Sequence, residues 1–218
     1  MKKTLTVTCL SLWLTAPALA LPSFQNGDFE TGDFTGWSGD LVSTGPVDPN
    51  LDPHFSIVPH AGPSSSYVAQ VQNDDTDWLT TLFQVFTLDS LPGPGWTMDI
   101  TFWIQWTPSD STQDALQVQL YDLGITDTVD LLSGVSNADL LGGTWVTQDI
   151  TRFARTWGGQ NVELAFTLSD FDLFTPDTLW LDGISINQRA PGSVPEPTSL
   201  VLLGSGILGL GVKRLRRP

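Results

Sequence analysis

Short stretches in which hydrophobic and polar residues alternate fill the middle of the chain, and Gly, Pro, Ser, Asn and Asp separate them. Successive side chains of a β-strand point to opposite faces, so a period of two predicts strands with one buried face, and no window shows a convincing helical period. The predicted strands are Tyr67–Gln72, Trp78–Leu88, Trp96–Trp106, Ala115–Asp122, Thr144–Thr151, Gln160–Ser169 and Thr178–Asn187, with an edge strand at His54–Val58 inside the proline-rich loops of residues 40–66.

Seven or eight strands with turn residues between them predict an all-β domain in which two sheets pack face to face, a β-sandwich of jelly-roll type. Every second residue is apolar in 96–106, 115–122 and 160–169, and we expect these three faces to share one core. Their other faces are polar but include aromatic rings. We find no internal repeat, and we place this domain at residues 21–188.

The N-terminus has the pattern of a removable signal peptide. Lys2 and Lys3 precede an apolar run at residues 5–14, and Ala18 and Ala20 form a small-x-small cleavage site. We therefore predict a signal peptide at residues 1–20, with an uncleaved membrane anchor as the alternative. The only cysteine, Cys9, lies inside this segment, so the exported protein is expected to have no disulfide.

The C-terminus combines a polar, proline-rich stretch, an apolar segment and a basic end, preceded by a linker at residues 189–193. The apolar residues 199–212 would span about 21 Å as a helix, short of the hydrocarbon core of about 30 Å. The four cations that follow should stay cytoplasmic, which places the rest of the chain across the membrane. We expect a short hydrophobic helix here, and a plain membrane anchor is the simplest interpretation.

Residues 194–218 resemble the PEP-CTERM sorting signal, through Pro195, Glu196 and Pro197, the glycine-spaced apolar run and the terminal arginines. The resemblance implies processing by exosortase, a transpeptidase-like enzyme of the inner membrane in Gram-negative bacteria that make exopolysaccharide. It implies export by the secretion machinery, a transient inner-membrane stage, and a final place at the cell surface or in the extracellular matrix.

The body between the two signals is strongly acidic. Residues 21–195 contain 23 acidic and 3 basic residues, a formal charge of −20. Such a charge disfavours nucleic acid and anionic membranes as partners. Solubility alone can account for it, and it also suits calcium, which binds carboxylate and carbonyl oxygens.

A second resemblance spans residues 24–188. The opening motif at residues 26–37 (NGDFETGDFTGW) and the closing segments 143–145, 162–166 and 179–184 are similar to galactose-binding-like jelly rolls, which include many carbohydrate-binding modules. The resemblance implies one structural calcium ion held by Glu30 and Asp182. The family often has a second acidic residue after the closing Asp, but Gly183 stands here. The alternative is that Glu30 ties down a turn through backbone N–H bonds.

Trp103 lies on the otherwise polar face of its predicted strand. A sugar ring stacks on such an aromatic ring, and amides bind its hydroxyl groups. The predicted ligand-binding residues, on what we take to be two neighbouring strand faces, are Trp103, Gln105, Gln117, Gln119 and Tyr121. The alternative is a tryptophan that packs beneath a loop. Trp37 is predicted to be core.

No catalytic pattern stands out. His54 and His60 lie in the proline-rich loops without a nearby nucleophile motif, and the chain has no G-x-S-x-G, phosphate loop or CxxC. The acidic run 73–77 lacks the ligand pattern of an EF-hand, so we interpret it as a solvated turn. We predict a non-catalytic protein that binds exopolysaccharide. The alternatives are a structural or adhesive matrix component without sugar recognition, and an accessory polysaccharide hydrolase.

Overall fold

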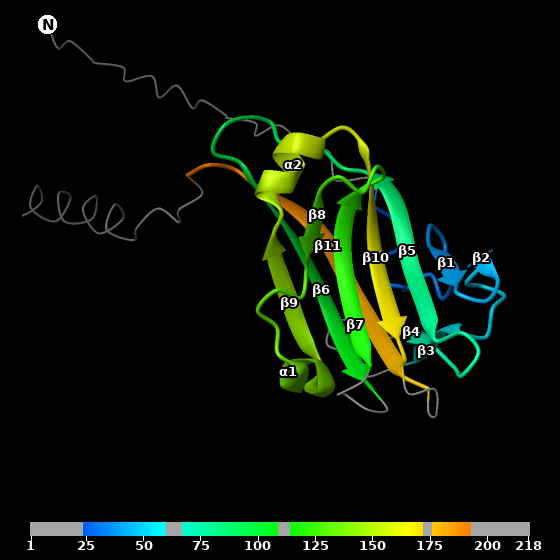
Figure 1. Cartoon of the computed structure of the whole chain (residues 1–218). Coiled ribbons are helices and arrows are strands. Elements are labelled where there is room, and N and C mark those ends of the chain that lie inside the picture. The colour runs from blue at the N-terminus through cyan, green and yellow to red at the C-terminus, as the bar shows by residue number, and fades with distance from the viewer. Residues whose placement is uncertain (1–23, 60–66, 109–113, 172–175, 193–218) are drawn as a thin grey trace, which may run out of the picture.

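Two antiparallel sheets packed face to face form the body in the computed structural model, which describes residues 24–59, 67–108, 114–171 and 176–192 (Figure 1). Sheet A has the order β2 (Gly45–Val47), β1 (Ser38–Leu41), β5 (Leu79–Thr87), β10 (Asn161–Ser169), β7 (Ala115–Asp122) and β8 (Thr128–Asp130). Sheet B has the order β3 (Phe55–Pro59), β4 (Tyr67–Gln72), β11 (Thr178–Arg189), β6 (Thr97–Thr107) and β9 (Thr144–Asp149). The predicted all-β jelly-roll sandwich is confirmed.

The predicted strands are present with shifts of at most two residues at their ends, and β4 and β7 match the prediction without any shift. Three short strands, β1, β2 and β8, were not predicted, because three or four residues give too little alternation to detect. The expectation of no helix in the body was wrong. Two short helices, α1 (Asn137–Gly142) and α2 (Thr151–Trp157), lie at opposite ends of the sandwich (Figure 1).

One core lies between the sheets. The apolar faces of β6, β7 and β10 all contribute to it, as their alternation predicts. Phe166 of β10 makes an edge-to-face contact with Phe102 of β6, with ring centroids 5.6 Å apart. Trp37 packs 6.1 Å from Phe166, so the prediction that it belongs to the core is confirmed. Such aromatic pairs each add about 1 kcal/mol beyond the area that they bury.

The segment that precedes β1 fastens the two sheets to each other. The side-chain amide of buried Gln84 on β5 accepts from the backbone N–H of Gln25 and donates to its carbonyl, both at 2.9 Å. Two residues later, the carbonyl of Gly27 accepts from the backbone N–H of Ile184 on β11, also at 2.9 Å. The segment therefore bonds to a strand of sheet A and to a strand of sheet B.

Candidate functional site

The five predicted ligand-binding residues do not form one surface. Trp103 and Gln105 lie on β6 in sheet B, whereas Gln117, Gln119 and Tyr121 lie on β7 in sheet A. In both strands these residues alternate with buried apolar residues, so their side chains point outward from opposite sides of the sandwich. The prediction of two neighbouring strand faces was wrong, because strands adjacent in sequence were assumed to be adjacent in one sheet.

Trp103 is covered. Its side chain is only 7% exposed, and a Cβ atom added to Gly143 would lie 2.8 Å from Cζ2 of its indole ring. The turn between α1 and β9 thus lies directly on the ring, as the alternative of a packing tryptophan anticipated. The neighbouring Trp145, directly opposite Trp103 on β9, is 45% exposed and is an accessible ring on this side of sheet B.

The outer side of sheet A brings rings, amides and carboxylates together across three strands. Cross-strand pairing places Glu163 of β10 between Val85 of β5 and Tyr121 of β7. One row further, Ala165 lies between Phe83 and Gln119. We call this surface the sheet A face and define it by Phe83, Val85, Gln117, Gln119, Tyr121 and Glu163. Val85 is 45% exposed and Gln117 is exposed, so these positions are accessible.

Tyr121 and Glu163 form the polar centre of the sheet A face. The Tyr121 hydroxyl donates a hydrogen bond to Oε1 of Glu163. Burial, the hydrogen bond to Glu163 and its charge raise the pKa of Tyr121, so the hydroxyl stays protonated. Burial raises the pKa of Glu163 and the charge of Asp40 adds to this, although the Tyr121 bond opposes it. A carboxyl group that is hydrogen-bonded in this way presents a fixed acceptor to a ligand hydroxyl.

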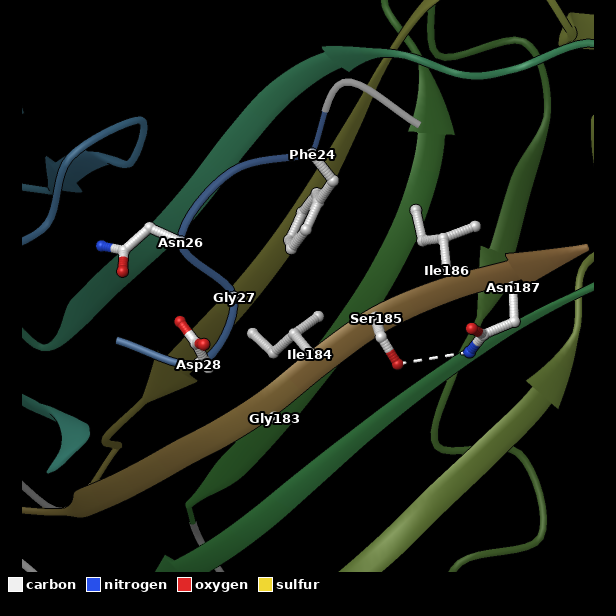
Figure 2. Close-up of a pocket in the computed structure, with 9 residues that line it drawn as sticks. All are labelled: Phe24, Asn26, Gly27, Asp28, Gly183, Ile184, Ser185, Ile186 and Asn187. Carbon is white, nitrogen blue, oxygen red and sulfur yellow. Dashed lines mark hydrogen bonds between the residues drawn. The ribbon is translucent and has the colours of Figure 1, made fainter. Parts of the chain in front are cut away.

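The residues predicted to hold calcium lie on segments that run side by side. Figure 2 shows the opening segment passing along β11, with Asp28 close to Gly183 and Ile184, beside a groove of about 420 Å³. Asp182 is fully buried on β11, and its Oδ1 accepts from the backbone N–H of Gly183 at 2.6 Å. Glu30 is exposed, and its Oε1 accepts from the backbone N–H of Tyr67 at 3.0 Å.

A cluster that the sequence did not reveal lies elsewhere. His54, Asp74 and Asp77 each offer a ligand atom, and these atoms lie within 4.8 Å of one another. Among the described residues, it is the one group of three or more His, Cys, Asp or Glu side chains whose ligand atoms lie close enough together to hold a metal ion. The sequence predicts a solvated turn at residues 73–77 and assigns His54 no role in binding. The signal available in the sequence was His54 at the start of a predicted edge strand whose hairpin partner ends at an acidic turn.

Comparisons with known proteins address the two parts of the chain separately. Residues 193–217 match the PEP-CTERM protein-sorting motif. A β-sandwich carbohydrate-binding module described as promiscuous is 14% identical, with a TM-score of 0.46 over 73% of this chain and 60% of that one. A module specific for non-crystalline cellulose is 15% identical, with a TM-score of 0.43 over 79% of this chain and 99% of that one. The active domain of tailspike protein 4 from bacteriophage CBA120 is 13% identical, with a TM-score of 0.48 over 78% of this chain.

The chain spans only 22% of the tailspike domain's length and 60% of the promiscuous module's. No curated protein matches the sequence.

Of the helices in the described ranges 24–59, 67–108, 114–171 and 176–192, none has the length and apolar character needed to cross a bilayer. The predicted signal peptide and hydrophobic tail, with Ala18, Ala20, Pro195, Glu196 and Pro197, lie outside these ranges. The chain thus joins an all-β sandwich similar to carbohydrate-binding modules to a C-terminal PEP-CTERM protein-sorting motif.

Proposed function

We propose that the protein is exported, is processed by exosortase at its C-terminal motif, and binds glycan without catalysis at the cell surface or in the exopolysaccharide matrix. The sorting motif at residues 193–217 supports the export and processing. The sheet A face supports the binding, and the Tyr121–Glu163 pair is the observation on which this part rests. Three of the predicted ligand-binding residues, Gln117, Gln119 and Tyr121, remain together on this face.

The chemistry of the sheet A face suits a neutral sugar chain. The rings of Phe83 and Tyr121 offer apolar surface for the C–H face of a pyranose, and Gln117, Gln119 and Glu163 offer donors and acceptors for its hydroxyl groups. The face also includes an ionisable carboxyl group in a body with a formal charge of −20 between residues 21 and 195. That charge repels polyanions, so we propose uncharged stretches of the polysaccharide as the ligand.

Affinity electrophoresis tests this function. Residues 21–193 should be retarded in gels that contain the producing organism's exopolysaccharide, and Tyr121→Ala should abolish most of the retardation. The matched control is Trp145→Ala, which removes an aromatic ring that is 45% exposed on the outer side of sheet B. That variant should migrate like the wild type. Trp103→Ala is a poor probe, because this tryptophan is buried and its removal would also lower stability.

The same experiment separates the alternatives. If wild type and both variants migrate freely, the protein is a structural or adhesive matrix component without sugar recognition. If Trp145→Ala alone loses retardation, the binding face is on sheet B. Release of reducing ends from the purified polymer, abolished by Glu163→Gln, would contradict the non-catalytic role and favour an accessory hydrolase.

We also propose that one structural calcium ion binds beside the opening segment, through Glu30 and Asp182. Both are carboxylates, the ligand type that calcium prefers, and the bond between Ile184 and Gly27 keeps their segments adjacent. Adding calcium to protein depleted by EGTA should raise the melting temperature, and Glu30→Gln should remove most of the rise. Asp33→Asn, an equal charge change in the same loop, should preserve it. Identical melts with and without calcium would contradict the site.

A further inference from the structure

We propose a second metal site, for a first-row divalent ion such as Zn²⁺, formed by His54 Nε2, Asp74 Oδ2 and Asp77 Oδ2. Nε2 of His54 lies 3.3 Å from Oδ2 of Asp74 and 3.9 Å from Oδ2 of Asp77. Ligand atoms around a tetrahedral zinc ion with bonds of 2.0–2.2 Å are about 3.4 Å apart. The pair with Asp74 already has this spacing, and the pair with Asp77 needs to close by about 0.5 Å.

Each ligand is held so that its metal-binding atom faces the site. The Nδ1–H of His54 donates to Oδ1 of Asp52 at 2.8 Å, which leaves the lone pair of a neutral ring on Nε2. A carboxylate that orients a histidine through its other nitrogen is the usual support of a metal-binding imidazole. This bond therefore selects the tautomer that binds a metal.

The two carboxylates are fixed in the same manner. Oδ1 of Asp74 accepts from the backbone N–H groups of Thr76 and Asp77, at 2.8 and 2.7 Å. Oδ1 of Asp77 accepts from the backbone N–H of Ser43 at 2.9 Å. In each case one oxygen is anchored by the backbone, and Oδ2 is the atom directed at His54.

Asp77 places a largely buried carboxylate at the site. Its side chain is only 8% exposed, and the 3.9 Å between Oδ2 and Nε2 of His54 is too long for a hydrogen bond between them. A largely buried carboxylate is unfavourable unless an opposite charge compensates it. A metal ion would supply that charge, and Asp74, which is 44% exposed, gives it a route from solvent.

Protonation of His54 is the competing arrangement. Burial alone would lower the pKa of His54, but the hydrogen bond to Asp52 and the charges of Asp52 and Asp74 raise it. A protonated ring would form ion pairs with the same carboxylates. Only a site with a neutral His54 binds a metal ion stoichiometrically, so a metal titration distinguishes it from the arrangement with a protonated ring.

The nitrogen ligand decides the class of metal. Calcium and magnesium take oxygen ligands, whereas imidazole suits zinc and its neighbours in the first transition row. Three protein ligands also leave a fourth position for water or an incoming group.

A bound ion would join the start of β3 in sheet B to the β4–β5 turn and, through Asp77, to the β1–β2 turn of sheet A. These elements gather at one side of the sandwich (Figure 1). Such a clip would connect the two sheets in a body whose sequence has no cysteine.

The site can be tested by calorimetric titration of the full chain with Zn²⁺. The titration is done in mild detergent and with excess Ca²⁺, which occupies exposed carboxylates. We expect one zinc ion per chain. Asp74→Asn should weaken the affinity at least about 10-fold, and Asp52→Asn about 10-fold through the orientation of His54. Asp75→Asn, in the same turn but exposed, should leave the affinity unchanged, as should His60→Ala.

Three results would each overturn the site. The first is saturable zinc binding that persists in both His54→Ala and Asp74→Asn, and the second is an equal loss of affinity in Asp75→Asn. The third is the absence of stoichiometric zinc binding by the wild type. Circular dichroism should confirm that each variant is folded. If His54→Ala does not fold, Asp74→Asn and Asp52→Asn decide the question, because Asp74 is 44% exposed and its change to an isosteric amide leaves the packing intact.

Discussion

Replacing Gly27 with alanine should destabilise the body by about 3 kcal/mol or more, one of the largest effects of a single methyl group in this chain. A Cβ atom at this position would lie 2.2 Å from the carbonyl oxygen of Ile184 and 2.7 Å from Cε1 of Phe24. The first of these atoms belongs to the backbone of β11, so the clash cannot be relieved by rotating a side chain. The opening segment has to move away from the strand.

That movement would break the hydrogen bond between Ile184 and Gly27 and strain the amide pair between Gln84 and Gln25, so buried polar groups would lose partners. Thermal unfolding measured by circular dichroism should show a melting temperature lower by about 10 °C. Gly93→Ala is the matched control, because no atom lies within 4 Å of its added Cβ. It should change the melting temperature by less than about 2 °C. Equal melting temperatures for the two variants would show that the opening segment does not fasten the sheets.

Deleting residues 194–218 should convert a protein retained at the envelope into one released to the medium. The deletion removes the sorting motif, the apolar segment and the basic end together. The sandwich should remain folded, because every described strand and its core lie between residues 24 and 192. Cell fractionation with immunoblotting, and circular dichroism of the released protein, measure both outcomes.

A second variant separates anchoring from processing. Changing Pro195, Glu196 and Pro197 to alanine keeps the apolar segment but removes the motif. If exosortase processes the tail, this variant should accumulate in the inner membrane with its C-terminus intact, as mass spectrometry would show. If it is instead processed and distributed like the wild type, the motif is not what the processing enzyme recognises. A truncated protein that still fractionates with membrane would mean that the tail is not the anchor.

The sequence predicted the inner faces of the sandwich better than its outer surfaces. Inside a strand, alternation alone decides which side chains face the core, and Phe102 and Phe166 meet there as expected. The outer surfaces depend on which strands are neighbours. Gln105 and Gln117 are 12 positions apart in the chain, yet they lie on different sheets, because pairing in this fold is long-range. No local pattern reports that pairing.

The sequence by itself determined the class of fold, the faces of the longer strands, the acidic character of the body and the sorting motif, because period, charge and a contiguous motif are local properties. The tertiary structure alone decided three other matters. It covers Trp103 with Gly143, it places Tyr121 beside Glu163, and it directs His54 at the acidic turn between β4 and β5. Each of these contacts joins residues from 20 to more than 40 positions apart, and strand pairing within one sheet brings them together: β6 with β9, β7 with β10, and β3 with β4.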